Sequence, residues 1–327
     1  MSLSISCKHE KGKHNNRDAY GDAMLELMAA DNKVVHIDCD LMNCINVKRL
    51  QKEYPNQVFN AGIAEQNAVA IAAGLAASGL TVFVHSFGCF ASRRAFDQAF
   101  LSIGYSERAV TIIGSDPGVT AEFNGATHMP FEDCALYMTI PDFIVIDSAD
   151  YAQTYSFTKV LAGCKKPAYL RLIRKEYVQI YEEGTEFEIG RGYILKDGKD
   201  VTIIASGIET DEALKAYELL KKKGISSKVI DMPTWKPLDE KVILDAVKET
   251  GCLVTAENHQ VSCGLGAQIA RLLLLNNPVP QEFIGIQDRF GQVGPRDYLM
   301  KEYNLLSEDI AKAAEKVINR KMHSIVS

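Results

Sequence analysis

The sequence predicts an α/β protein with two open, doubly wound and mostly parallel sheets in tandem. Short apolar segments alternate with segments of helical periodicity along nearly the whole chain, which is the pattern of parallel sheets covered on both faces. The alternation is interrupted by the polar residues 182–185 and begins again at Val201. The 327 residues are enough for two domains with cores of their own. We therefore expect a first domain over residues 1–185 and a second over residues 186–327.

The first domain is expected to begin with a helix over residues 17–30 and a strand over residues 34–38. Later strands are predicted to start at Val58, Thr81, Val110, Phe143 and Ala168, alternating with helices that start near Glu65, Ala95, Phe131 and Tyr151. The helix over residues 64–78 is almost free of polar residues after its first turn. We expect it to be buried on all sides.

The second domain is expected to repeat this organisation on a smaller scale. After an extended arm over residues 187–196, the pattern predicts strands over residues 201–205, 228–231, 252–256 and 283–286 and helices over residues 211–223, 240–250, 266–275 and 307–318. Trp235 follows a strand in a loop with two prolines. We expect Trp235 to pack on its own domain, and a position at an interface is the alternative.

Composition gives no sign of a nucleic-acid or membrane partner. The formal net charge is −6, and the chain has no basic cluster of the kind that nucleic acid requires. Apolar runs are too short for a membrane span, and residues 1–16 are polar and lack the core of a signal peptide, so we expect a cytoplasmic protein. The eight cysteines form no CxxC pair and show no metal-binding spacing, so we expect free thiols and no metal site in this chain.

Glu65 is the acidic residue of greatest interest in the first domain. It follows a strand and opens the apolar helix, which is where open α/β sheets place their ligand chemistry. A helix cap, stabilised by the helix dipole by about 0.3–1 kcal/mol, is the alternative. Among the neighbouring Ala and Ile residues the carboxyl group would lie in a dry pocket, as an acid–base role requires.

Three motifs follow one another in the first domain. They are the helix that begins at Glu65, the segment 86–98 with Phe87 and Phe90, and the stretch Asn124-Gly125-Ala126-Thr127-His128. In this order and spacing they resemble the pyrimidine-binding domain of transketolases, which are thiamine-diphosphate enzymes. The segments 203–209, 228–233, 256–259 and 264–266 resemble the C-terminal domain of the same family. The resemblance therefore covers nearly the whole chain.

The resemblance implies roles for residues around the cofactor. Glu65 would hydrogen bond to the aminopyrimidine of thiamine diphosphate and favour the tautomer that activates the cofactor. Phe87 and Phe90 would form the pyrimidine pocket, with Phe90 stacking on the ring. Asp40 and Leu41 correspond to residues near the thiazolium ring, although Asp40 alternatively caps a turn or a helix.

The resemblance also implies a substrate site. His128 matches a histidine that binds substrate hydroxyl groups and transfers protons, and Asn124 replaces an acidic residue of the same motif. Arg17 and Arg174 match two arginines that hold a sugar phosphate, and Cys44 replaces a serine beside them. Ordinary ion pairs at the surface are the alternative for both arginines.

The chain lacks the Gly-Asp-Gly segment with a later Asn through which this family binds the diphosphate and its metal ion. The resemblance therefore implies the C-terminal subunit of a split transketolase. Its N-terminal partner subunit would supply the Mg²⁺ and diphosphate site, with a homodimer of this chain inside a heterotetramer. Such an enzyme transfers a two-carbon ketol unit from a ketose or ketose phosphate to an aldose or aldose phosphate. Alternatives are a β-type subunit of a 2-oxo acid dehydrogenase, a relative of deoxyxylulose-phosphate synthase, and a non-catalytic scaffold subunit.

Overall fold

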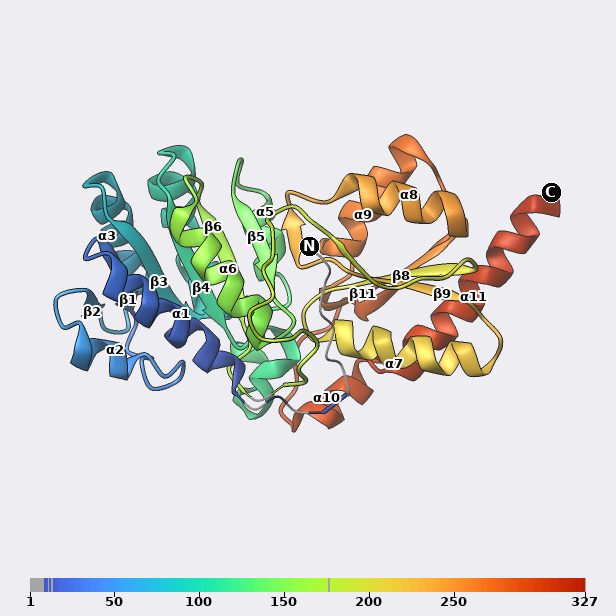
Figure 1. Ribbon diagram of the computed structural model, residues 1–327, viewed down its shortest axis with the longest axis horizontal. Helices are drawn as coiled ribbons and strands as arrows, with labels where there is room; N and C mark the ends of the chain where they lie inside the picture. Colours follow the sequence, from blue (N-terminus) through green and yellow to red (C-terminus); the bar gives the residue numbers. More distant parts are fainter. Residues whose placement is uncertain (1–8, 11, 13, 176, 327) are drawn as a thin grey trace.

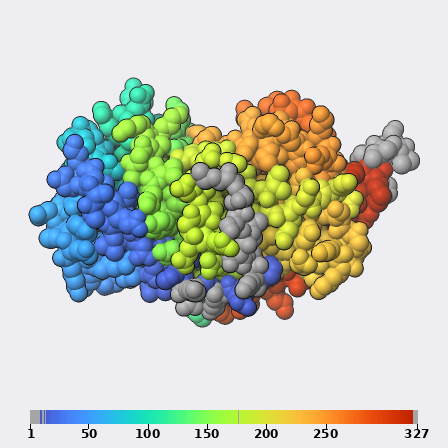
Figure 2. Space-filling view, in the orientation of Figure 1, coloured from blue at the N-terminus to red at the C-terminus, as the bar shows by residue number. Residues whose placement is uncertain are grey.

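The computed structural model describes residues 9, 10, 12, 14–175 and 177–326. These residues form two mostly parallel sheets with helices packed on both faces of each, and the sheets lie side by side along the long axis of the molecule (Figure 1). Figure 2 shows the same arrangement as two lobes, with the yellow-green residues that connect the two halves of the chain between them. The predicted fold class is confirmed.

The first sheet has the strand order β10-β5-β6-β4-β3-β1-β2. Its strands are β1 (Val34–Asp38), β2 (Val58–Asn60), β3 (Thr81–Phe87), β4 (Val110–Ser115), β5 (Ile144–Asp147), β6 (Ala168–Leu172) and β10 (Thr234–Lys236). Neighbouring strands are parallel except β10 and β5. The carboxyl ends of β1, β3 and β4 therefore meet at one edge, where loops can gather ligand-binding side chains.

Helices cover both faces of this sheet, and each face has an apolar core of its own. One face carries α1 (Asn16–Ala30) and α6 (Tyr151–Gly163), which pack on each other and on alternate side chains of the strands. The other face carries α3 (Glu65–Ala77), η1 (Phe90–Arg94), α4 (Phe96–Gln98), η2 (Ala99–Tyr105) and α5 (Asp133–Met138). The short helix α2 (Lys48–Glu53) lies next to β2.

The second sheet has the order β12-β11-β8-β9-β7. Its strands are β7 (Tyr193–Lys196), β8 (Val201–Ala205), β9 (Ser227–Asp231), β11 (Leu253–Gln260) and β12 (Gln281–Ile286), and its helices are α7 (Glu209–Lys222), α8 (Glu240–Thr250), α9 (Leu265–Asn276), α10 (Arg296–Glu302) and α11 (Ser307–Val326). Helices α7 and α11 cover one face, and α8 and α9 cover the other (Figure 1).

Helix α3 differs from its prediction. Its inner side chains are buried against β3, but Ala70, Ile71 and Gly74 face outward and are exposed. The expectation that this helix is buried on all sides is therefore wrong for the isolated chain, because the described elements of this chain cover only its inner side. An apolar helix with one open face needs a second surface to cover it.

Trp235 also differs from its prediction. Trp235 lies in β10, which pairs antiparallel with β5 of the first sheet. The strands before and after it in the sequence, β9 and β11, belong to the second sheet, which is built from the second half of the chain. The indole is buried, donates from Nε1 to the Ser206 hydroxyl at 3.0 Å and lies 5.6 Å from the Arg171 guanidinium. Trp235 is thus an interface residue between the two halves, which was the alternative reading of the sequence.

Candidate active site

Glu65 opens α3 just beyond the carboxyl end of β2, and its side chain is only 2% exposed. One carboxylate oxygen accepts a hydrogen bond from the Ser86 hydroxyl at 2.9 Å, and the other accepts from Arg94 Nη1 at 2.8 Å. The helix provides no side-chain cap at this end. The structure therefore places Glu65 in the expected dry position, held by two donors rather than acting as a cap.

Arg94 was not singled out by sequence analysis, although it is the ionic partner of Glu65. Its guanidinium carbon lies 4.2 Å from the centre of the Phe90 ring while the same group donates to the carboxylate. The planar guanidinium of Arg94 thus makes the two contacts that we expect of a bound aminopyrimidine. It donates a hydrogen bond to Glu65 and lies over the face of the Phe90 ring. The only signal in the sequence was an arginine four residues after Phe90, one helical turn away.

An aromatic cluster adjoins this ion pair. Phe87 ends β3 and Phe90 begins η1, and their ring centres lie 6.3 Å apart. His128, in the 3₁₀ turn η4 (Ala126–His128), packs edge-on against both rings with centre distances of 5.8 Å and 5.1 Å. The three motifs that lie apart in the sequence therefore converge on one site.

Buried polar side chains support the strand ends under the site. Asp38 Oδ2 contacts His85 Nδ1 at 2.8 Å, and His85 Nε2 contacts the Ser115 hydroxyl at 2.9 Å, so one chain of hydrogen bonds crosses β1, β3 and β4. Burial opposes ionisation of Asp38, yet hydrogen bonds with His36 and His85 hold its pKa well below its usual range. The other Asp38 oxygen accepts from the backbone N–H of Leu41, which fixes the turn that leaves β1.

Asp40 and Leu41 follow β1 in that turn. Asp40 is exposed, adopts φ of 63° and exchanges two hydrogen bonds with Asn60 at 3.0 Å and 3.1 Å. The Asp40 side chain thus pairs with the Asn60 side chain, while the Leu41 backbone N–H in this turn donates to Asp38, so capping by Asp40 stays a prediction. Leu41 is half-buried beside it. A role of either residue near the thiazolium ring stays a prediction.

Arg174 links the aromatic cluster to Asp116. It donates from Nε to Asp116 Oδ1 at 3.0 Å, its Nη2 lies 2.9 Å from the other oxygen, and its guanidinium carbon is 5.7 Å from the centre of Phe87. Burial raises the pKa of Asp116 while Arg174 opposes the shift. Burial likewise raises the pKa of the half-buried Cys44 thiol, with the same arginine acting in the opposite direction. Cys44, Asp116 and Arg174 thus share one electrostatic environment.

The two remaining candidates, Arg17 and Asn124, have fewer contacts that fix their side chains. Arg17 lies in the first turn of α1, and within the described part of the chain its buried Nε has no hydrogen-bond partner. An orphaned buried donor suits an anionic ligand. Asn124 ends the 3₁₀ segment η3 (Gly118–Asn124) and is exposed. No contact ties either residue to the aromatic cluster among the described residues.

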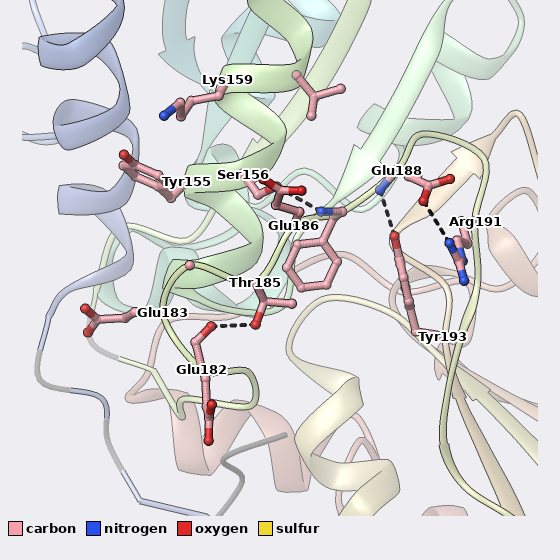
Figure 3. A pocket seen from close by; sticks show the side chains of 13 residues that line it. Tyr155, Ser156, Lys159, Glu182, Glu183, Thr185, Glu186, Glu188, Arg191 and Tyr193 are labelled. Atoms are coloured by element: carbon pink, nitrogen blue, oxygen red, sulfur yellow. Dashed lines mark hydrogen bonds and ion pairs between the residues drawn. The ribbon is translucent and has the colours of Figure 1, made fainter. Parts of the chain in front are cut away.

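A large cavity lies away from these candidate residues. It measures about 1020 Å³ and is lined by Tyr155 and Lys159 of α6, by residues 182–188 and by Arg191 and Tyr193, and it includes the ion pair of Arg191 with Glu188 (Figure 3). It contains none of the candidate residues. A small hollow of about 10 Å³ is lined by Glu65, Ser86 and Cys39.

Within the described residues, no group of three or more His, Cys, Asp or Glu side chains is arranged to hold a metal ion. No helix in the same part of the chain is long and apolar enough to cross a membrane.

Comparison with known protein families identifies both halves. Residues 12–179 match the family model of the transketolase pyrimidine-binding domain, and residues 190–310 match that of the transketolase C-terminal domain. Fold and site together therefore define a chain of the thiamine-diphosphate enzyme class.

Individual relatives show which family within this class the chain belongs to. The chain is 44% identical to the 6-deoxy-6-sulfo-D-fructose transketolase subunit SqwH of Clostridium sp. (strain MSTE9), covering 94% of this chain and 96% of the relative. It is 36% identical to one of the subunits of the apulose-4-phosphate transketolase of Phocaeicola vulgatus, covering 93% and 97%. Human transketolase is 32% identical over 93% of this chain, which spans 49% of that enzyme. The chain belongs to the transketolase family.

A solved structure agrees with this assignment. The split-gene transketolase described as an inactive beta4 tetramer superposes with a TM-score of 0.87 at 37% identity, covering 95% of this chain and all of the other. The chain is therefore similar over almost its whole length to subunits of split transketolases.

Proposed function

We propose that this chain is the C-terminal subunit of a two-chain, thiamine-diphosphate-dependent transketolase that transfers a two-carbon ketol unit from a ketose to an aldose. The observation that carries the proposal is that Glu65 and Phe90 both contact Arg94 and that the same Phe90 ring packs against His128. A buried carboxylate held by Ser86 and by an arginine that reaches in from the surface is the kind of group that functional sites contain, and this favours an enzyme over a non-catalytic scaffold.

The residues at the site fit the pyrimidine half of the cofactor. Glu65 would offer its carboxyl group to a ring nitrogen, and Phe87 and Phe90 would hold the ring by apolar contact and stacking. The Arg94 guanidinium, a planar group that contacts both Glu65 and Phe90, supports the proposal that a planar ring could take up the same contacts. Thiamine diphosphate, when bound, supplies a carbon nucleophile and an electron sink for the transferred unit. Glu65 would share a proton with the bound ring and exclude water from it.

Substrate contacts would come from His128 and the arginines. His128 borders both phenyl rings and would donate to, or accept from, a substrate hydroxyl group. Arg174 and Arg17 would hold the anionic end of the sugar by forked hydrogen bonds. Relatives are named for a sulfonated ketose and for a sugar phosphate, so both kinds of anion are candidates for this end.

A partner subunit would complete the enzyme. We assign the Mg²⁺ and the diphosphate site to an N-terminal subunit, with two copies of each chain in a heterotetramer. The open face of α3 supports this, because Glu65 begins the helix and Ala70, Ile71 and Gly74 leave its outer side uncovered. A partner docked there would close the site over Glu65.

Reconstitution tests the proposal. This chain is mixed with its N-terminal subunit, Mg²⁺ and thiamine diphosphate, and ketol transfer is followed from a ketose phosphate and from 6-deoxy-6-sulfo-D-fructose. We expect activity only with both chains present and a loss of at least about 100-fold in Glu65→Gln. Glu240→Gln is the matched control, because Glu240 is an exposed acid at the start of α8 and has the same place in a helix without a site. Full activity of Glu65→Gln would refute the role of Glu65.

A further inference from the structure

The loop after β4 carries two of the candidate substrate residues, Asn124 and His128. It consists of short 3₁₀ turns rather than regular structure. Its residues with positive φ are Asp116 (58°), Gly118 (51°), Glu122 (49°) and Gly125 (74°). Such conformations are costly for residues other than glycine and persist only where surrounding structure imposes them. The shape of this loop must therefore be fixed from outside.

Asn258, at the carboxyl end of β11 in the second half of the chain, holds the beginning of the loop. Its side-chain oxygen accepts from the Val119 backbone N–H at 3.0 Å, and its side-chain nitrogen donates to the Pro117 carbonyl at 3.0 Å. Both bonds are buried. A Cβ atom on Gly118 would lie 2.1 Å from the Asn258 oxygen, so the contact also requires glycine at that position.

Gln260, two residues further along β11, holds the end of the same loop. Its backbone N–H donates to the Phe131 carbonyl at 2.8 Å. Its side chain accepts from the Asp288 N–H at 3.0 Å and donates to the Arg289 carbonyl at 3.1 Å. One strand end of the second half therefore fastens both stems of the loop and a neighbouring loop as well.

Apolar packing between the halves backs these hydrogen bonds. The shared cluster contains Val119, Met129 and Phe131 from the loop and Ile286, Leu299 and Tyr303 from the second half. The rings of Phe131 and Tyr303 meet edge-on with centres 5.7 Å apart. Met129, which follows His128, lies so close to Gly291 that an added Cβ there would be 2.6 Å from its sulfur. The position of His128 is thus set on both sides by the second half.

We propose that Asn258 is a positioning residue for substrate recognition: by fastening the loop, the second half of the chain sets the place of His128 relative to Phe87 and Phe90. The inference rests on the proposed transketolase function. Asn258 itself touches neither the aromatic cluster nor Glu65 in the described structure. Its loss would therefore weaken substrate binding while leaving the cofactor contacts in place.

The test compares Asn258→Ala and Asn258→Asp with wild type in the reconstituted two-chain enzyme. The aspartate keeps the acceptor for Val119 but sets a second oxygen against the Pro117 carbonyl, which it cannot hydrogen bond. Thr202→Val is the matched control. It removes a buried side-chain hydrogen bond to Thr250 at 2.8 Å in the same half of the chain, away from the loop.

For both Asn258 variants we expect the KM for the ketose donor to rise by about 10-fold. The Kd of thiamine diphosphate, measured by calorimetry on the same samples, should stay within about twofold of wild type. Thr202→Val should leave both constants unchanged. An unchanged donor KM in both variants, or a cofactor Kd that rises in parallel with it, would overturn the inference while the proposed function stands. A wild-type enzyme without activity on either donor would overturn both.

Discussion

Glu65 and Arg94 form an ion pair at the start of α3, with 2.8 Å between Oε2 and Nη1. The carboxylate is buried, whereas the guanidinium side chain is 44% exposed and lies over Phe90. The negative charge in the site is thus balanced by one side chain that reaches in from the surface. Burying a charge without a partner is costly, so Arg94 stabilises the chain: among the described residues, Ser86 would otherwise be the remaining side-chain partner of Glu65.

Replacing Arg94 by Met is expected to destabilise the isolated chain by about 1–3 kcal/mol. Methionine keeps apolar contact with Phe90 but leaves the Glu65 charge unpaired. The double variant with Glu65→Gln should recover most of the loss, because no buried charge remains. Urea unfolding at neutral pH measures all of these free energies.

Arg93→Met provides the control for this prediction. Arg93 is the neighbouring arginine and is equally exposed, but it pairs with Glu132 at 3.2 Å and donates to the Thr127 carbonyl at 3.1 Å. A pair at the surface contributes at most about 1 kcal/mol. If Arg94→Met were no more destabilising than Arg93→Met, the balance of charge at Glu65 would not depend on Arg94.

Phe90→Leu is expected to weaken binding of thiamine diphosphate to the assembled two-chain enzyme by about 2- to 10-fold. The reason is the loss of aromatic stacking, worth about 0.5–1.5 kcal/mol, with apolar contact largely kept. Calorimetric titration of the cofactor measures the change. Phe100→Leu is the control, since Phe100 lies in η2 and contacts Phe96 instead of the site. Equal Kd values for wild type and Phe90→Leu would contradict stacking on this ring.

The stability of the folded chain should depend on pH through Asp231. Burial raises the pKa of Asp231 to about 6, although Tyr181, Gln153 and Thr210 donate hydrogen bonds to it. The folded chain therefore binds a proton more tightly here than the unfolded chain does. The stabilisation is complete below about pH 4 and is lost as pH rises through 6.

Asp231→Asn removes this titration. The free energy of unfolding of the variant, relative to wild type, should rise by up to about 3 kcal/mol between pH 4 and 7. Urea unfolding at four pH values in this range gives the difference curve. Asp142→Asn, at an exposed position, should show no such rise. A flat curve for Asp231→Asn would mean that Asp231 is ionised in the folded protein throughout this range.

Much of this structure could be predicted because the signals are local. The strands β1 and β8 and the helix α8 have the predicted bounds, since each is a short apolar or periodic segment between polar residues. Glu65, Phe87, Phe90 and His128 were found by their motifs, and the parallel order of the strands brings them together.

What could not be predicted depends on pairing between distant segments. Nothing around Arg94 indicates that it reaches Glu65, which lies 29 positions earlier. The contact of His85 with Asp38 follows from the register of β1 and β3, which the sequence does not state. The open face of α3 was missed for another reason: apolar composition shows that a helix must be covered, but not that this chain supplies the cover.

Arg171→Met is expected to lower the free energy of unfolding by about 3–5 kcal/mol. Arg171 is fully buried, donates from Nε to Asp133 at 3.0 Å and lies 3.4 Å from Asp147, so its removal leaves two acidic groups without their cation. Chemical denaturation of the full chain measures the loss. Arg191→Met, which breaks the exposed pair with Glu188, should cost less than about 1 kcal/mol. Similar losses in the two variants would show that the Arg171 charge is not compensated as the structure indicates.

Ile71→Glu should separate assembly from folding. Ile71 is 41% exposed on the open face of α3, so the isolated chain should keep its free energy of unfolding within about 0.5 kcal/mol. If the N-terminal subunit covers this face, the carboxylate would be buried without a partner and the Kd of the two chains should rise more than about 10-fold. Sedimentation of the mixed chains measures that Kd, and sedimentation of this chain alone shows whether a second copy covers the face instead.

Leu274→Glu is the matched control for assembly, because Leu274 is an exposed leucine on α9 of the second half, 74% accessible. The Leu274→Glu variant adds the same charge to an exposed apolar position of a helix, but in the second half of the chain and not on the helix that Glu65 begins. Weakened association in Ile71→Glu alone would place the partner over α3 and next to the Glu65 carboxylate. Equal effects of both substitutions would instead point to added charge as the cause, and an unchanged Kd in Ile71→Glu would exclude this face from the contact between the subunits.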